Sequence, residues 1–113
     1  MTAATQLKLS PIKAVDPLPP PNNFPLFQLG QIVATPGAID LLRSLELNPL
    51  LFLGKHVYGN WGQLDDHDRE ANQRALKYGD RLLSSYTLTS TEKLWIITEA
   101  DRSSTTLLLP QEY

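Results

Sequence analysis

The chain has 113 residues, of which 42% are hydrophobic and 19% are charged, and its formal net charge is −2. This length and composition predict one soluble domain with a single core. The charge argues against broad nucleic-acid binding, which needs an excess of Lys and Arg, although a local basic patch stays open. The absence of cysteine excludes disulfides, thiolate catalysis and cysteine-bound zinc. No apolar run approaches the roughly 18 residues of a membrane span, and the N-terminus lacks the pattern of a secretory signal. We therefore expect a cytoplasmic protein with no membrane contact and no cofactor.

Residues 1–28 are rich in proline and contain six of the nine prolines of the chain. Four of the six lie at 17–21, which predicts an extended, polyproline-like or disordered tail. Such a tail can serve as a ligand for an aromatic groove, but an inert tail is the more common case. We predict a tail over 1–28 and one domain over 29–113. At least one apolar residue of 24–27 is expected to pack against the core.

A short strand is predicted over 29–34, and two helices follow it over about 36–45 and 49–58. Each helix starts with the same signal, a capping side chain (Thr35 or Asn48) followed by a proline. A proline is favourable at the first helical position because its missing N–H would have no partner there. The second helix is apolar nearly all round, so we expect it to be the most buried helix.

A third helix is predicted over 65–78, with an acidic first turn that complements the helix dipole and with Gly79 just after its end. Its apolar stripe is thin, so it should face solvent. Strands are then expected at 81–89, 94–98 and 105–109, because these stretches are β-branched or aromatic and polar turns separate them. The predicted fold is α+β, with about three short helices packed on one face of a C-terminal three-stranded antiparallel meander.

The acidic residues Asp65, Asp66 and Asp68, together with His67, could be read as a cation site. Their spacing does not match a calcium loop, which needs alternating ligands, a glycine turn and a closing Glu. They are better explained as solvated charges that cap the third helix, and no metal site is predicted.

Two residues before the third helix have both a structural and a functional interpretation. His56 lies in the last turn of the second helix, where a histidine can cap the carbonyl end or act as a general base. Trp61 lies between two glycines, Gly59 and Gly62, and either fills the core or stands in a groove. The core position is favoured for Trp61.

The chain resembles a family of small, uncharacterised bacterial proteins that occur on plasmids and in genomes. The resemblance covers about residues 29–113 and rests on three stretches: H-V-Y-G-N-W-G-Q-L-D-D-H-D-R-E-A-N at 56–72, R-L-L-S-S-Y at 81–86 and W-I-I-T-E-A-D-R-S-S-T-T-L-L-L-P-Q-E-Y at 95–113. Such proteins are often labelled "type I restriction endonuclease subunit M" or "plasmid-related protein". The resemblance implies no particular activity.

The methyltransferase implied by that label can be tested against the residues. A modification subunit needs a glycine-rich cofactor loop and an N/D-P-P-Y/F motif, and the chain has neither. The family pattern usually has Asp before the tryptophan, where this chain has Asn60. That departure favours a structural role for the loop around Trp61.

The first functional hypothesis is a protein-binding or regulatory module, because no complete catalytic constellation is present. The partner would be another protein, which meets an exposed edge of the sheet and the connector before the last strand. Association of identical chains through a sheet edge is a second form of the same idea. The candidate binding residues are Trp61, Glu99, Asp101, Arg102 and Thr105.

The second hypothesis is a metal-independent ribonuclease of the toxin type, and only here is RNA a partner. His56 would serve as the base, and Arg81 and Arg102 would stabilise the charge developing on phosphate. Fold analogy is a weak argument for activity, and the acidic balance weakens it further. Each arginine directly follows an aspartate, so a solvated ion pair is the simpler explanation. The hypothesis requires that the three side chains converge on one concave surface.

Overall fold

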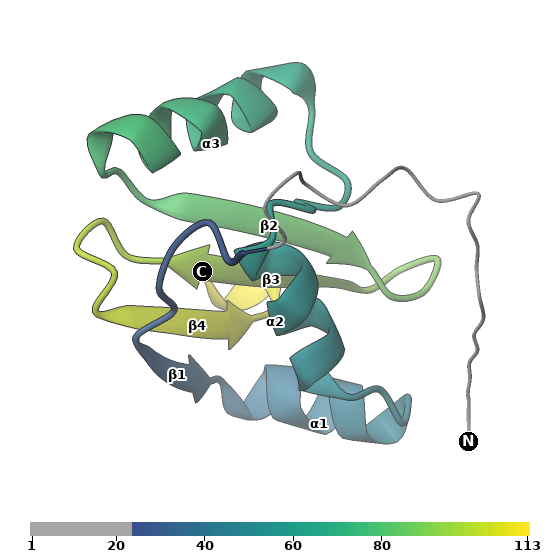
Figure 1. The fold of residues 1–113 in the computed structure, drawn as a ribbon. Coiled ribbons are helices and arrows are strands. Elements are labelled where there is room, and N and C mark those ends of the chain that lie inside the picture. Colours follow the sequence, from purple (N-terminus) through teal and green to yellow (C-terminus); the bar gives the residue numbers. More distant parts are fainter. Residues whose placement is uncertain (1–23) are drawn as a thin grey trace.

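The computed structural model describes residues 24–113, which form three helices, four strands and a final 3₁₀ turn (Figure 1). In chain order the elements are β1 (Gln31–Ala34), α1 (Pro36–Ser44), α2 (Pro49–Val57), α3 (Asp66–Tyr78), β2 (Leu82–Thr87), β3 (Lys93–Thr98), β4 (Ser104–Leu108) and η1 (Pro110–Glu112). The predicted proline-rich tail falls outside the described residues as far as residue 23.

The strands form one mixed sheet in the order β1-β4-β3-β2. The antiparallel pairs of β2 with β3 and of β3 with β4 confirm the predicted meander. β1 extends this meander by pairing parallel to β4, with Gln31 beside Ser104. The prediction of a three-stranded sheet was therefore wrong, although the strand itself was expected. A parallel pair between segments so far apart leaves no local signal in the sequence.

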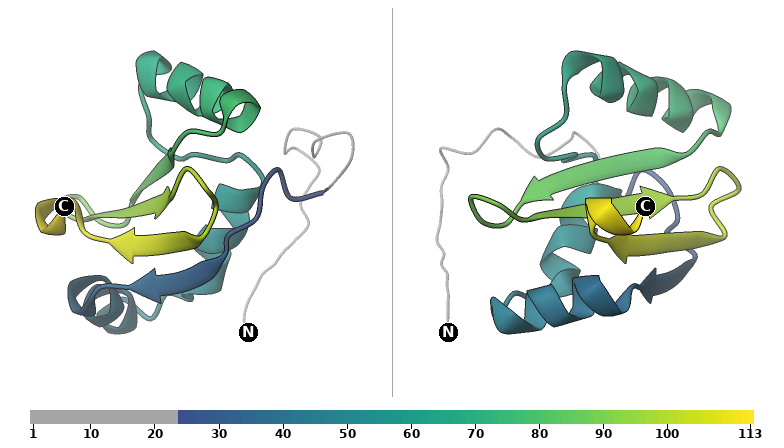
Figure 2. Two further views of the ribbon diagram at one scale, coloured as in Figure 1. Left: turned by 90° about the vertical axis from the view of Figure 1, so that its left-hand side faces the viewer. Right: turned by 180° about the vertical axis from the view of Figure 1, so that it is seen from behind.

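One helix, α2, lies over a face of the sheet. α1 continues from β1 along the lower edge of the sheet and contributes Ala38 and Leu42 to the same core, whereas α3 lies beyond the edge strand β2 (Figures 1 and 2). The opposite face carries the C-terminal η1. The expectation that all helices share one face was therefore wrong, because α1 and α3 lie along the two edges of the sheet and Asn72 of α3 hydrogen-bonds to β2. The main core consists of Ala38, Leu42, Phe52, Leu53, Tyr86, Leu94, Ile96, Leu107 and Leu109.

The predicted helix starts are confirmed at the level of single hydrogen bonds. The Thr35 hydroxyl accepts from the backbone N–H of Ala38 at 3.1 Å, and the Asn48 side chain accepts from that of Leu50 at 2.9 Å. α2 contributes more buried residues than either other helix, as expected. It also leaves Leu50 and Leu51 exposed, at 66% and 54% of their surface.

Part of the segment predicted as tail packs onto the domain. The Leu26 N–H donates to the Val57 carbonyl at 2.8 Å, at the end of α2. The Phe27 ring stacks on Trp61 with 6.2 Å between ring centres. The expectation that an apolar residue of 24–27 would reach the core is confirmed by Phe27, and the domain begins before residue 29.

Candidate functional site

His56 lies inside the protein and has no exposed surface. The geometry of α2 directs its ring at the sheet, where Nδ1 is 2.6 Å from the Ser84 hydroxyl and Nε2 is 2.9 Å from the Thr98 hydroxyl. The Thr98 hydroxyl is in turn 2.7 Å from that of Thr105, which donates to the Leu29 carbonyl at 2.7 Å. A continuous chain of hydrogen bonds therefore runs from β2 to α2, then through β3 and β4 to Leu29, which precedes β1.

The carbonyl at the end of this chain sets the direction of each hydrogen bond from Leu29 back to Nε2 of His56. A carbonyl only accepts, so the single proton of Thr105 is committed to Leu29, and Thr98 must donate to Thr105. His56 then donates to Thr98 from Nε2, and in the neutral ring Nδ1 accepts from the Ser84 hydroxyl. Each polar atom of the chain is satisfied by the neutral imidazole with its proton on Nε2.

Burial also opposes a charge on the ring. Desolvation lowers the pKa of His56 to about 4. Two aromatic rings cover it edge-on, Phe27 at 5.1 Å and Trp61 at 5.7 Å between ring centres. His56 therefore has a structural role, as one of the two interpretations expected. It fulfils this role by hydrogen-bonding to two strands of the sheet, and not by capping the end of α2 in contact with solvent.

Trp61 is also a core residue, with 3% of its surface exposed. Gly62 follows it with φ of +79°, and a Cβ there would overlap the Ser85 carbonyl. The glycine thus lets the loop approach β2 closely enough to seat the indole. Trp61 and Thr105, both proposed as binding residues from the sequence, are buried and present no side chain to a partner in this structure.

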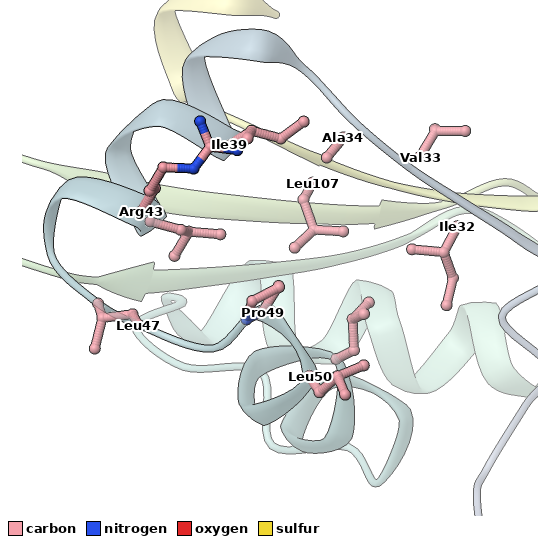
Figure 3. A pocket seen from close by; sticks show the side chains of 11 residues that line it. Ile32, Val33, Ala34, Ile39, Arg43, Leu47, Pro49, Leu50 and Leu107 are labelled. Atoms are coloured by element: carbon pink, nitrogen blue, oxygen red, sulfur yellow. The ribbon is translucent and has the colours of Figure 1, made fainter.

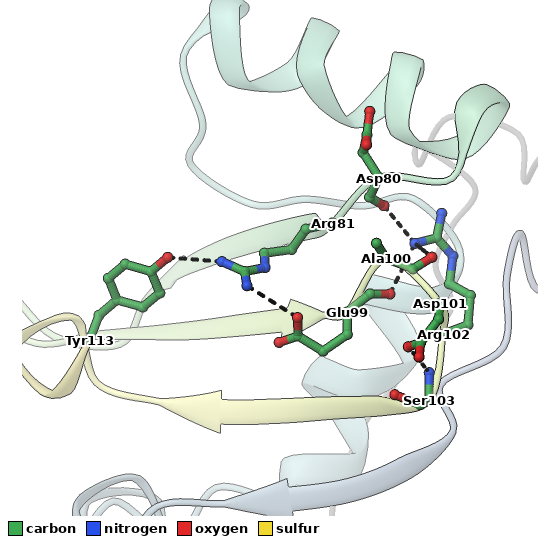
Figure 4. A network of polar contacts seen from close by, with 8 residues as sticks. All are labelled: Asp80, Arg81, Glu99, Ala100, Asp101, Arg102, Ser103 and Tyr113. Carbon is green, nitrogen blue, oxygen red and sulfur yellow. Dashed lines mark hydrogen bonds and ion pairs between the residues drawn. The ribbon is translucent and has the colours of Figure 1, made fainter.

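Arg102 is used within the fold. Its guanidinium donates to four backbone carbonyls, and the two shortest bonds reach Asp80 at 2.6 Å and Ala75, near the end of α3, at 2.9 Å. The other two acceptors are Glu99 and Ala100 in its own loop. Arg102 therefore ties the β3–β4 loop to the C-terminal end of α3 (Figure 4).

Arg81 and Glu99 form an ion pair on the sheet face that α1 and α2 leave uncovered. Arg81 is 3.1 Å from the Glu99 carboxylate and also donates to the Tyr113 hydroxyl at 2.9 Å (Figure 4). The Glu99 charge is the main cause that raises the pKa of Arg81. Asp101 is exposed and accepts from the Ser103 N–H at 2.9 Å, and the side chain and backbone of Ser103 lower the pKa of its carboxyl. The contact between Asp101 and Ser103 therefore stabilises the loop between β3 and β4.

The three residues of the ribonuclease hypothesis do not converge. His56 is buried beneath the helices, Arg81 lies on the opposite face of the sheet, and Arg102 is bonded to backbone carbonyls at the β3–β4 loop. A general base must reach the proton it abstracts, and a sealed imidazole cannot do so. The arrangement as it stands offers no assembled phosphate site from these residues.

The two edges of the sheet differ sharply. At the β2 edge, the Asn72 amide donates to the Leu83 carbonyl at 2.7 Å and accepts from the Leu83 N–H at 3.1 Å. Backbone from the loop after α2 pairs with Ser85 in the same way, through Trp61 and Gln63. The Gln63 side chain then accepts from Thr87 at 2.8 Å. Side chains and a loop thus occupy this edge along its length.

The β1 edge has no such cover among residues 24–113, where β4 is the neighbour that pairs with β1. An apolar groove of about 390 Å³ runs beside it, between β1, α1 and the first turn of α2. Figure 3 shows Ile32 from the strand, Ile39 from α1 and Leu50 from α2 around it. These three side chains are 41–66% exposed, and Val33 is 40% exposed.

The sequence contained a weak signal for this surface that the initial interpretation missed. Ile32 and Val33 are adjacent in one strand, so they point to opposite faces of the sheet. Leu50 and Leu51 are likewise adjacent apolar residues near the start of a short helix. In each pair, two adjacent apolar side chains cannot both face the core. Ile32, Val33 and Leu50 line the groove instead.

Within the described range, no three His, Asp or Glu side chains come together as a metal site. None of the helices between residues 24 and 113 has the length and apolar character needed to cross a membrane. No protein-family model matches the chain, and comparisons with curated proteins and with solved structures gave no match either. The family resemblance noted from the sequence stays a prediction.

Proposed function

We propose that the protein is a protein-binding module whose binding surface is the β1 edge together with the adjacent apolar groove. The observation that supports this most directly is the contrast between the two sheet edges: among residues 24–113 the β2 edge is occupied along its length, whereas the outer side of β1 has no covering segment. Exposed strand edges are templates for pairing, and proteins usually block them with charges, proline or covering segments.

The chemistry of the surface fits a protein ligand better than a small polar molecule or RNA. Ile32, Ile39 and Leu50 supply apolar contact, and the edge of β1 supplies backbone donors and acceptors. Strand addition combines these two elements, since main-chain hydrogen bonds give affinity and side-chain pockets give specificity. Arg43 is the cationic residue among those lining the groove, and Asp40 lies 3.9 Å from it. The groove therefore offers little attraction for a phosphate backbone.

Photo-crosslinking in the native cell tests this surface. A photoreactive phenylalanine analogue replaces Ile39 or Leu50 at the groove, and Tyr78 on α3 serves as the matched control because it is 68% exposed. We expect a discrete crosslinked protein from at least one groove position and none from residue 78. Equal crosslinking from all three positions, or none from the groove, would contradict the proposal.

A further inference from the structure

We infer that the occupant of the β1 edge is a second copy of this chain, with the two β1 strands paired antiparallel about a two-fold axis at Val33. This inference rests on the proposed function, because it names the partner of the same surface.

The backbone groups that point outward belong to alternate residues of β1. The Gln31 N–H donates to the Ser103 carbonyl and the Thr35 N–H donates to the Leu107 carbonyl, so both groups point toward β4. In a parallel pair every second residue directs its N–H and C=O to the neighbouring strand, so Gln31, Val33 and Thr35 face β4. The residues that alternate with them direct these groups to the other side. Ile32 and Ala34 therefore present their backbone groups at the open edge.

An antiparallel two-fold pairing satisfies all of these groups at once. With Val33 on the axis, Ile32 lies opposite Ala34 of the partner subunit, and the reciprocal pair follows by symmetry. Each of these residues then donates and accepts one hydrogen bond across the interface. On the groove face a large side chain meets a small one, and on the opposite face Val33 meets its own copy. Both combinations suit close strand packing.

The charges near the strand permit two identical surfaces to meet. β1 has the sequence Q-I-V-A and contains no charged residue and no proline. Outside the strand, the Asp40–Arg43 pair on α1 is of opposite sign, and the Glu112 carboxylate accepts a hydrogen bond from Thr35, two residues away from the axis at Val33. Like charges facing each other across a two-fold axis would oppose association, and the strand offers none.

The dimer also leaves no open edge, and this favours a second copy over an unrelated peptide. Joining the two β1 strands gives one continuous sheet with a β2 strand at each end. Each β2 edge is already occupied by Asn72, by the backbone around Gly62 and by Gln63. The assembly therefore closes at two copies, as expected for an isologous interface.

Sedimentation of the full chain over a concentration series tests the inference. We expect the wild type to approach twice the chain mass of 12.6 kDa as concentration rises. Val33→Lys should be monomeric, because two ammonium groups then meet on the axis. Thr87→Lys, on the exposed part of β2, is the matched control and should associate like the wild type.

A mixture of Val33→Lys and Val33→Glu tests the register itself. Opposite charges meet only if residue 33 of one copy faces residue 33 of the other, so the mixture should form a dimer although neither variant does alone. Circular dichroism checks that each variant is folded.

Three outcomes would overturn the inference: a wild type that is monomeric at every concentration, a Val33→Lys variant that still dimerises, or a mixture that does not associate. If the chain is monomeric while a groove position crosslinks to another protein, the inference fails and the proposed function stands. If the groove crosslinks to nothing and the chain is monomeric, both fail.

Discussion

At the scale of single residues, the groups that looked chemically active are used to hold the fold together. His56 and Arg102 were both candidates for catalysis from the sequence. The first is sealed in a hydrogen-bond chain and the second binds four backbone carbonyls. Residue type indicates which bonds a side chain can make, but burial decides whether a substrate can reach it.

Acidification is expected to destabilise the protein through His56. Its pKa is about 4 in the folded chain and 6.5 in the unfolded chain, so the unfolded state binds the proton first. The stabilisation is complete above pH 6.5 and is lost as the pH falls toward 4. The difference between the two pKa values corresponds to about 3 kcal/mol.

Urea unfolding at neutral pH and at about pH 5 measures this loss. His67 is exposed on α3, so His67→Gln should keep the pH dependence of the wild type. His56→Gln should be less stable at neutral pH, and its stability should vary little between the two conditions. A wild type whose stability is the same at both pH values would contradict the assignment of a neutral, buried imidazole.

Arg102→Ala is expected to lower the free energy of unfolding by about 2 kcal/mol, because hydrogen bonds from a charged donor are lost and several carbonyls lose their partner. The residue also has φ of +60°, which suits alanine poorly. Arg74→Ala, on the exposed side of α3, is the control and should change stability by less than about 0.5 kcal/mol. Equal effects in chemical denaturation would show that Arg102 is a surface charge only.

At the scale of the elements, α3 protects a strand rather than covering a face. It lies beside β2, and Asn72 supplies from a helix the two hydrogen bonds that a neighbouring strand would make. A side-chain amide that takes the place of a neighbouring strand in this way closes an edge without extending the sheet. The amphipathic pattern of α3 was too thin to reveal this, because the helix buries only Asn72 and Ala75 against its neighbours.

Asn72→Ala should therefore cost about 2 kcal/mol, since the N–H and C=O of Leu83 lose their partners in a partly buried setting. The neighbouring Gln73→Ala is the matched control, because Gln73 is exposed on the same helix. Thermal or urea unfolding measures both. The role assigned to Asn72 is wrong if the two variants are equally stable.

For the whole molecule, the order of the strands predicts how protection against hydrogen exchange is distributed. β3 lies between two strands and is buried over most of its length, whereas all four residues of β1 are exposed. We expect amides of β3 to exchange slowest and those of β1 fastest among the strands. Association through β1 should slow the amides of Ile32 and Ala34 in particular, because that of Gln31 is already bonded to β4.

Exchange followed residue by residue by NMR, at low and high protein concentration, measures this. A β1 strand as protected as β3 at low concentration would contradict the assignment of β1 as a weakly held edge. Slowing of all β1 amides with concentration, rather than of the outward pair, would point to general stabilisation instead of pairing.

The sequence by itself determined the local structure: the starts of α1 and α2, the end of α3 at Gly79, and the β2–β3–β4 meander. Each of these depends on residues close together in the chain, such as a cap, a proline or an alternating strand. Only the tertiary structure decided that β1 pairs parallel to β4, that His56 is sealed and that the β1 edge is left uncovered by the rest of residues 24–113. The β1–β4 pair and the hydrogen bonds of His56 join residues that are far apart in the chain, and the open edge is what remains once the strands have paired. No local sequence pattern encodes such long-range contacts.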